Sequence, residues 1–248
     1  MKTLIIGALS AAALLAVAPA ANAGSGYVAA AYTRANVDAG FGDDDADGYG
    51  IDGAWAFEPS AGLGVEIDAG YADADGSDNE VYGVTAHVNA RNDSYLFGGF
   101  VGLADAADET IWSAGLEGQK YYDNVTLAGA VGYANADDSD ADIYGVDGEA
   151  RYFLSDNFRI QGALGYAKVE AGAADDNVWS AGAGGEYQFA SAPVSIFGGY
   201  THSEFDDADI TSDAFTVGVR YNFGGTLKDR DRSGASLAGL SSLVSSAF

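Results

Sequence analysis

The sequence alternates apolar residues with polar or small ones at a period of two, in segment after segment along most of its length. In 213–223, for example, the odd positions from Phe215 to Phe223 are all large and apolar, whereas the even positions between them are polar or glycine. Successive side chains of a β-strand point to opposite faces, and a helix would mix the two sets. Glycine, at 35 of 248 residues, also disfavours long helices. The chain is therefore expected to be all-β.

Twelve segments of about ten residues show this alternation and are predicted to be strands. They are 26–37, 49–58, 63–72, 81–91, 95–104, 110–122, 125–134, 142–153, 158–169, 178–189, 194–203 and 213–223. Between them, short turns alternate strictly with longer acidic connections, at 40–48, 73–80, 105–109, 135–142, 170–177 and 204–213. Transmembrane β-barrels alternate in the same way, with tight periplasmic turns and longer outside loops. Ten strands are the alternative, if two of the segments are loops.

Aromatic residues gather near the strand ends on the apolar face, around a centre rich in aliphatic residues and glycine. Two such girdles mark the two interfaces of a membrane. A soluble β-sandwich is the alternative, but it would turn its second face to water, and its turn lengths need not alternate. We therefore expect residues 24–223 to form an antiparallel up-and-down transmembrane β-barrel.

The first 23 residues have the three parts of an export signal. Lys2 supplies a positive start, 3–17 is an apolar core, and the small residues Ala21 and Ala23 form an A-x-A cleavage site. Residues 1–23 are thus predicted to be a signal peptide. No run of 18 apolar residues follows Gly24, which argues against a membrane-spanning helix. An even strand number would leave both ends of the chain on the periplasmic side, where an exported chain arrives.

Charge and composition exclude several classes of function. The net charge is −26, with 37 acidic and 11 basic residues, so no nucleic-acid partner is expected. The absence of cysteine excludes disulfides, thiolate metal sites and a cysteine nucleophile. Only His87 and His202 could serve acid–base chemistry, and Ser203 would point away from its neighbour His202 on a strand. Although Glu204 lies near His202, we do not expect an enzyme.

The last predicted strand carries the clearest likeness to a known group. With its alternating apolar residues and aromatic end, 215–223 resembles the final strand of Gram-negative outer-membrane β-barrels of the porin or opacity-protein type. The resemblance implies a place in the cell outer membrane, with lipid as one partner. It also implies an assembly signal at Val219, Tyr221 and Phe223 that the barrel-assembly machinery reads. In this family the chain usually stops there, whereas here 224–248 follow; we expect them to form a flexible or weakly helical periplasmic tail.

Parity places twelve ionisable side chains on the lumen face of the predicted barrel. They are Asp52, Glu66, Asp68, His87, Arg91, Glu117, Asp147, Glu149, Arg151, Arg159, Glu186 and Arg220. Many other inward positions are Gly, Ala or Ser, which leaves space for a narrow water-filled path. The predicted function is a porin-like channel for passive diffusion of ions and small hydrophilic solutes, with a weak preference for cations. A structural or adhesin-like surface barrel without an open pore is the alternative.

The six longer connections hold 23 of the 37 acidic residues and no Lys or Arg. Clustered carboxylates repel one another, so they either extend into water or attract cations. Asp43, Asp45 and Asp47 precede Gly48 as in the start of a calcium loop, but Ala54 stands where an EF-hand needs Glu. These three aspartates are the candidate ligands for a weakly held Ca²⁺ or Mg²⁺; a solvated acidic rim is the alternative. No other cofactor is expected.

Overall fold

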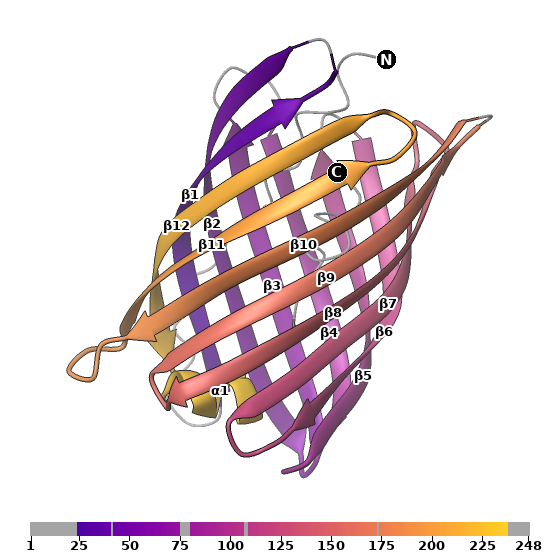
Figure 1. The fold of residues 1–248 in the computed structure, drawn as a ribbon. Coiled ribbons are helices and arrows are strands. Elements are labelled where there is room, and N and C mark those ends of the chain that lie inside the picture. The colour runs from indigo at the N-terminus through magenta and orange to yellow at the C-terminus, as the bar shows by residue number, and fades with distance from the viewer. Residues whose placement is uncertain (1–23, 41, 75–79, 107–108, 173, 238–248) are drawn as a thin grey trace.

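The computed structural model describes residues 24–237, apart from 41, 75–79, 107–108 and 173. The described strands form one closed antiparallel barrel, in which sequence neighbours pair and β1 pairs with β12 (Figure 1). The strands are β1 (Gly24–Asp38), β2 (Asp43–Ser60), β3 (Leu63–Ala74), β4 (Glu80–Arg91), β5 (Tyr95–Ala106), β6 (Glu109–Tyr121), β7 (Val125–Ala136), β8 (Ala141–Ser155), β9 (Phe158–Ala171), β10 (Ala174–Gln188), β11 (Val194–Phe205) and β12 (Ile210–Phe223). The predicted all-β barrel with twelve strands is confirmed, and the alternative of ten strands is wrong.

Most strands are longer, and most acidic connections shorter, than the sequence predicts. β1 and β2 pair from Gly24 opposite Phe57 to Asp38 opposite Asp43, so most of the expected loop 40–48 is strand. In Figure 1 this hairpin stands above the rest of the barrel. Apolar alternation ends where lipid would end, whereas backbone hydrogen bonding continues into water because each N–H and C=O still needs a partner. The acidic residues therefore lie on the ends of strands as well as in turns.

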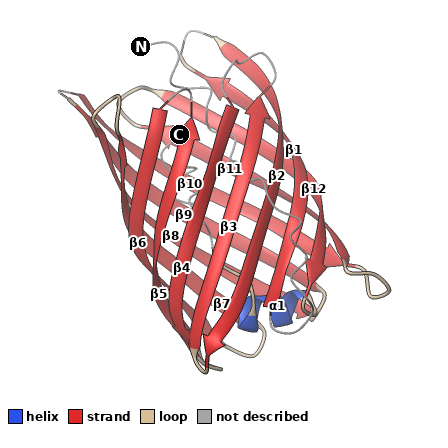
Figure 2. Cartoon of the chain, turned by 180° about the vertical axis from the view of Figure 1, so that it is seen from behind, coloured by secondary structure: helices blue, strands red, loops and turns tan. Residues whose placement is uncertain are grey.

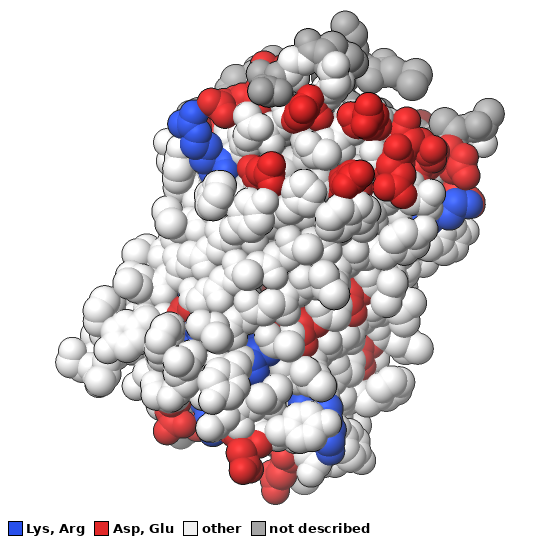
Figure 3. Space-filling model, in the orientation of Figure 1, with Lys and Arg blue, Asp and Glu red and all other residues white. Residues whose placement is uncertain are grey.

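The outer wall of the barrel is apolar around its middle. Leu164 is 69% exposed, Val101 61% and Val217 60%. Figure 3 shows an almost uncharged middle zone below an acidic upper end. Aromatic side chains border this zone on both sides, among them Tyr95, Tyr122, Tyr152, Tyr187 and Tyr221 toward one end and Tyr49, Tyr82, Trp112, Tyr144 and Trp179 toward the other. So large an exposed apolar surface suits lipid rather than water.

A short helix, α1 (Leu227–Ser233), follows the last strand. It lies at the end of the barrel where β1 begins and β12 ends (Figures 1 and 2). No helix in the described part of the chain is long and apolar enough to cross a membrane.

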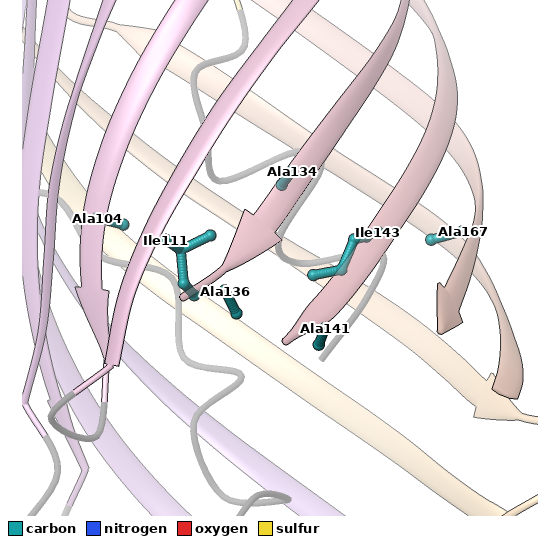
Figure 4. Packing of buried hydrophobic residues seen from close by; sticks show 7 residues of the cluster. All are labelled: Ala104, Ile111, Ala134, Ala136, Ala141, Ile143 and Ala167. Atoms are coloured by element: carbon teal, nitrogen blue, oxygen red, sulfur yellow. The ribbon is translucent and has the colours of Figure 1, made fainter. Parts of the chain in front are cut away.

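The end of the lumen remote from α1 has an apolar inner wall on β5 to β9. Seven buried side chains form this group: Ala104, Ile111, Ala134, Ala136, Ala141, Ile143 and Ala167 (Figure 4). Five of the seven are alanine, so the wall itself takes up little of the lumen at this height. The charged inner side chains lie closer to α1.

The orientation in the membrane gives a first testable prediction. If the acidic end faces outward, a small epitope inserted at Asp207, in the β11–β12 turn, should be labelled in intact cells. An epitope at Asp156, in the β8–β9 turn at the opposite end, should be labelled only after the outer membrane is permeabilised. Flow cytometry with an impermeant antibody measures both, and labelling at Asp156 alone would reverse the assigned topology. Asp75, an equivalent insertion point by sequence, lies outside the described residues.

Candidate functional site

The candidate site is the charged lumen near α1. All twelve ionisable residues that parity predicts for the lumen lie on strand faces that point inward. Glu66 and His87 are fully buried, and Glu186, Glu117 and Arg151 are at most 5% exposed. The charged side chains fall into three groups, each of which joins two or more elements of the structure.

The first group surrounds Glu186, on β10. Its carboxylate lies 3.0 Å from Arg159 on β9, 2.6 Å from Arg220 on β12 and 3.2 Å from Arg230 on α1. Ser195 donates a further hydrogen bond of 2.6 Å to the same carboxylate. Three guanidinium groups thus share one carboxylate, which leaves this point of the lumen positively charged.

Aromatic rings support the arginines of this first group. The guanidinium of Arg220 lies 4.2 Å from the ring centre of Tyr27 and 4.6 Å from that of Phe197. Arg230 lies 4.9 Å from the Tyr27 ring. Cations over aromatic faces are attracted by the ring quadrupole, and planar guanidinium groups stack well there. Asp52 is the second carboxylate near Arg220, at 3.9 Å.

The second group is centred on His87, on β4. Its Nε2 lies 2.7 Å from Asp68 on β3, and its Nδ1 lies 2.9 Å from Glu117 on β6. The ring therefore bridges two carboxylates across the inner wall. Phe100 on β5 packs beside it, with ring centres 5.8 Å apart. β4 lies opposite β10 in the closed barrel, so this group and the Glu186 group are on opposite inner walls.

The third group links β8 to the chain beyond the barrel. Arg151 contacts Glu149 at 2.5 Å and Asp231 of α1 at 2.8 Å. Thr126 on β7 donates to the other oxygen of Asp231, at 2.5 Å. Asp147 lies two residues from Glu149, and its Oδ2 is buried with no hydrogen-bond partner among the described residues.

The chain after Phe223 enters the same end of the lumen. Arg91 donates to the carbonyl of Gly234 at 3.0 Å, and Glu66 accepts from the backbone N–H groups of Ser236 and Leu237 at 3.3 and 3.2 Å. Sequence reasoning treats this segment as a tail in the periplasm and misses these contacts. Within the predicted flexible or weakly helical tail, the structure places a helix at α1, and 238–248 lie outside the described residues.

One local signal in the sequence does mark α1. Thr226 and Asp229 form a capping box, in which the Thr226 side chain accepts from the Asp229 N–H and the Asp229 side chain accepts from the Thr226 N–H. The pattern T-x-x-D at 226–229 is visible in the sequence and could have predicted where the helix starts. Its contacts inside the barrel could not be read in this way, because they depend on the closed lumen.

A cavity of about 210 Å³ lies in the lumen beside the Glu186 group. Its wall comes from β9 to β12, and small residues such as Gly182, Gly184 and Gly199 dominate it. Arg159 and Arg220 border it on the side of α1. A solute that follows this wall would therefore meet the two arginines.

The predicted assembly signal lies on the outside of the barrel seam. Val219 and Tyr221 are each 55% exposed, and Phe223 is half-buried opposite Gly26 of β1. Their positions on the lipid face of the last strand agree with the pattern that prompted the prediction. Recognition by the assembly machinery stays a prediction.

The positively charged side chain of Arg34 lies beside the predicted cation site. Arg34 on β1 lies 2.6 Å from Asp45 and 3.8 Å from Asp47, and Tyr32 donates to Asp47 at 2.6 Å. The side chain of Asp43 lies outside the described residues. Among the side chains that are described, no group of three or more His, Asp or Glu could hold a metal ion. Sequence reasoning missed Arg34 because its register opposite Asp47 is a property of the pairing between β1 and β2.

Comparisons with known proteins agree with this fold. No protein-family model and no curated protein matches the sequence. Among solved structures, the KdgM porin is 14% identical with a TM-score of 0.54, over 79% of this chain and 99% of that one. The NanC porin is 8% identical with a TM-score of 0.54, over 77% and 98%. The translocator domain of the autotransporter NalP from Neisseria meningitidis is 12% identical with a TM-score of 0.51, over 83% and 90%.

At such identities the likeness concerns the fold alone. It confirms the predicted resemblance to outer-membrane β-barrels, and the predicted place in the cell outer membrane agrees with this fold and with the apolar outer wall. The three similar structures include both porins and an autotransporter domain, so the likeness does not select a solute.

Proposed function

We propose that this chain is a porin-like channel of the outer membrane, through which ions and small hydrophilic solutes diffuse passively. The observation that carries the proposal is a lumen lined by charged groups of both signs next to a cavity of about 210 Å³ walled by small residues. The side chains of Arg159 and Arg220 line this cavity and stay 13% and 12% exposed, and exposed charged groups require water, so such a wall suits an aqueous path. Two of the similar solved structures are named porins, which agrees with this proposal.

A weak preference for cations is part of the proposal. The barrel end remote from α1 is densely acidic (Figure 3). Low-dielectric walls focus the field of such a mouth and raise the local concentration of cations. The Glu186 group, with its three arginines, acts in the opposite direction deeper in the lumen. The net preference is therefore expected to be modest.

We predict that this preference falls with salt and depends on the acidic end. Screening reaches about 30 Å at 0.01 M salt and only about 3 Å at 1 M, so rim charges act on passing ions mainly in dilute salt. Replacing Asp137, Asp138 and Asp140 by Asn should shift the reversal potential toward anions in dilute salt, measured across a salt gradient in planar bilayers.

The matched control replaces three aspartates in the turns at the opposite end, Asp93, Asp123 and Asp156, by Asn. It removes the same charge and should shift the reversal potential less when the salt gradient is applied from the acidic side. Equal shifts for both triple variants, or an anion-selective parent barrel, would contradict the proposed role of the acidic end.

We also propose that the barrel has no catalytic role. His202 and Ser203 are adjacent on β11, with Ser203 buried on the inner face, so the two side chains cannot form a Ser–His pair. His202 contacts Asp213 at 2.8 Å near the acidic end. Ester and peptide substrates offered to the purified barrel test this proposal, and turnover abolished by His202→Ala would overturn it.

A further inference from the structure

We propose that Gly224–Leu237 is a releasable plug that closes the inner mouth of the channel. The proposal rests on the proposed function, because a plug matters only in a lumen that conducts. From here on, this segment is called the plug. Its described contacts, its local conformation and the chemistry of its partners each support the assignment.

The plug crosses the full width of the lumen. Its hydrogen bonds, ion pairs and side-chain contacts reach ten of the twelve strands, namely β1 to β8, β10 and β12. Ala235 packs against Ala54 and Ala56 of β2, while Leu237 packs against Leu96 and Tyr121 on β5 and β6. A segment that touches nearly the whole inner circumference obstructs the lumen at this end of the barrel.

The contacts are specific for this segment, because its charges match the wall. Arg230 and Asp231 are neighbours in sequence and carry opposite charges. Each contacts a wall residue of the opposite sign: Arg230 lies 3.2 Å from Glu186, and Asp231 lies 2.8 Å from Arg151. Arg230 is 4% exposed and Asp231 1%. Exchanging the signs of these two residues would set like charges together at both points.

Backbone groups of the plug are recognised as well. Glu66, with no exposed surface, accepts from two successive N–H groups, and Gln119 donates to the carbonyl of Ser236 at 3.1 Å. On the far side, Arg232 donates to the carbonyl of Tyr122 at 2.5 Å. An inner wall that satisfies the peptide groups of a bound segment has the chemistry of a peptide-binding site.

The plug can leave without breaking the barrel. All twelve strand pairs, including the seam from Gly26 opposite Phe223, are made without it. The chain reverses at Gly224 and Gly225, whose φ values of 96° and 126° favour glycine and mark a turn between wall and plug. α1 has seven residues, too few to be a stable helix in isolation, so it holds its shape through docking. Most partners are polar and can be hydrated once the plug is out.

The first experiment compares single-channel conductance of the full chain with that of a chain ending at Gly224. We expect the shortened barrel to insert, because Phe223 completes the last strand, and to conduct several-fold better in planar bilayers. Heat-modifiable migration on gels verifies that it is folded. Equal conductance of two folded barrels would overturn the plug while leaving the channel intact.

The second experiment measures docking without any conductance. The chain has no cysteine, so Ser236→Cys gives one thiol, which the docked plug should protect from a charged maleimide. Adding Asp231→Asn removes a buried partner of Arg151, a loss worth more than the 1.4 kcal/mol of a tenfold change, so labelling should be at least about tenfold faster. Asp93→Asn is the matched control: it removes the same charge from an exposed turn at the same end of the barrel and should leave labelling slow.

The two readouts separate the two proposals. A protected thiol in a chain whose shortened form is folded but silent in bilayers would mean a docked segment in a barrel that is no channel, and the proposed function would fail. Rapid labelling of Ser236→Cys in the otherwise unchanged chain would mean that the segment is not docked, and the plug would fail. Protection, release by Asp231→Asn and a several-fold rise in conductance would together support both.

Discussion

Replacing Glu186 by glutamine should destabilise the folded barrel by about 3–5 kcal/mol, the usual effect of removing one partner from a buried ion pair. Glutamine keeps the size and can still accept from Ser195, but it leaves three guanidinium groups close together with only Asp52, 3.9 Å from Arg220, as a nearby carboxylate. The side chains of Arg159 and Arg220 are 13% and 12% exposed, so lumen water can relieve only part of this cost. The urea midpoint of the gel-shifted folded form in detergent measures the loss.

Two controls isolate the arginine group as the cause. Glu170 forms an ion pair with Lys168, and its side chain is 44% exposed. Glu170→Gln should therefore lower the free energy of unfolding by at most about 1 kcal/mol. In the chain ending at Gly224, Glu186→Gln should still destabilise, though less, because Arg230 is gone and Arg159 and Arg220 remain. A loss for Glu186→Gln no larger than that for Glu170→Gln would show that lumen water compensates the arginines fully.

The second large effect concerns the outer wall. Val217→Arg should destabilise the barrel by about 2–4 kcal/mol, because an arginine near the bilayer midplane must leave lipid or draw water into it. Val217 is 60% exposed on the lipid face. The neighbouring Thr216 lines the lumen cavity, so Thr216→Arg should cost much less, apart from the loss of its 2.8 Å contact with Thr33. Unfolding of both variants in lipid vesicles of one composition provides the comparison.

The same pair of variants checks the register of the last strand. A shift of one residue would exchange the two faces and therefore the two results. Equal losses at positions 216 and 217 would mean that neither face is lipid-exposed, which would contradict a membrane-spanning strand here.

Much of the barrel could be predicted from the sequence, since a period of two determines sidedness. The same alternation that separates Val217 from Thr216 correctly turns Glu66, His87 and Glu186 inward. Strand number followed from the same pattern. The positions of the strand ends could not be predicted in this way. The alternation of side chains marks only the part of a strand that contacts lipid, whereas the backbone pairing of β1 with β2 continues through the acidic residues as far as Asp38 and Asp43.

The partners of the inward residues could not be predicted from the sequence. Parity states that Arg151 faces the lumen, but its contact with Asp231 joins residues 80 positions apart. Arg34 was likewise hidden, because the acidic segment was considered without the strand that pairs with it. The plug was the largest omission: its apolar residues are few, and its fit depends on ten strands at once. Local patterns carry no information about such a composite surface.

The seam between β1 and β12 has a consequence for the order of assembly. Every other strand pair joins sequence neighbours, whereas this one brings Gly26 to Phe223 across nearly the whole chain. Closure must therefore wait for the last strand, and ordering so long a loop makes it a slow event. The surface that holds Gly224–Leu237 does not exist before then, because it is shared among strands from β1 to β12. Docking of this segment is thus expected to be the last folding step. The time at which a thiol at position 236 becomes protected would therefore report when the barrel has closed.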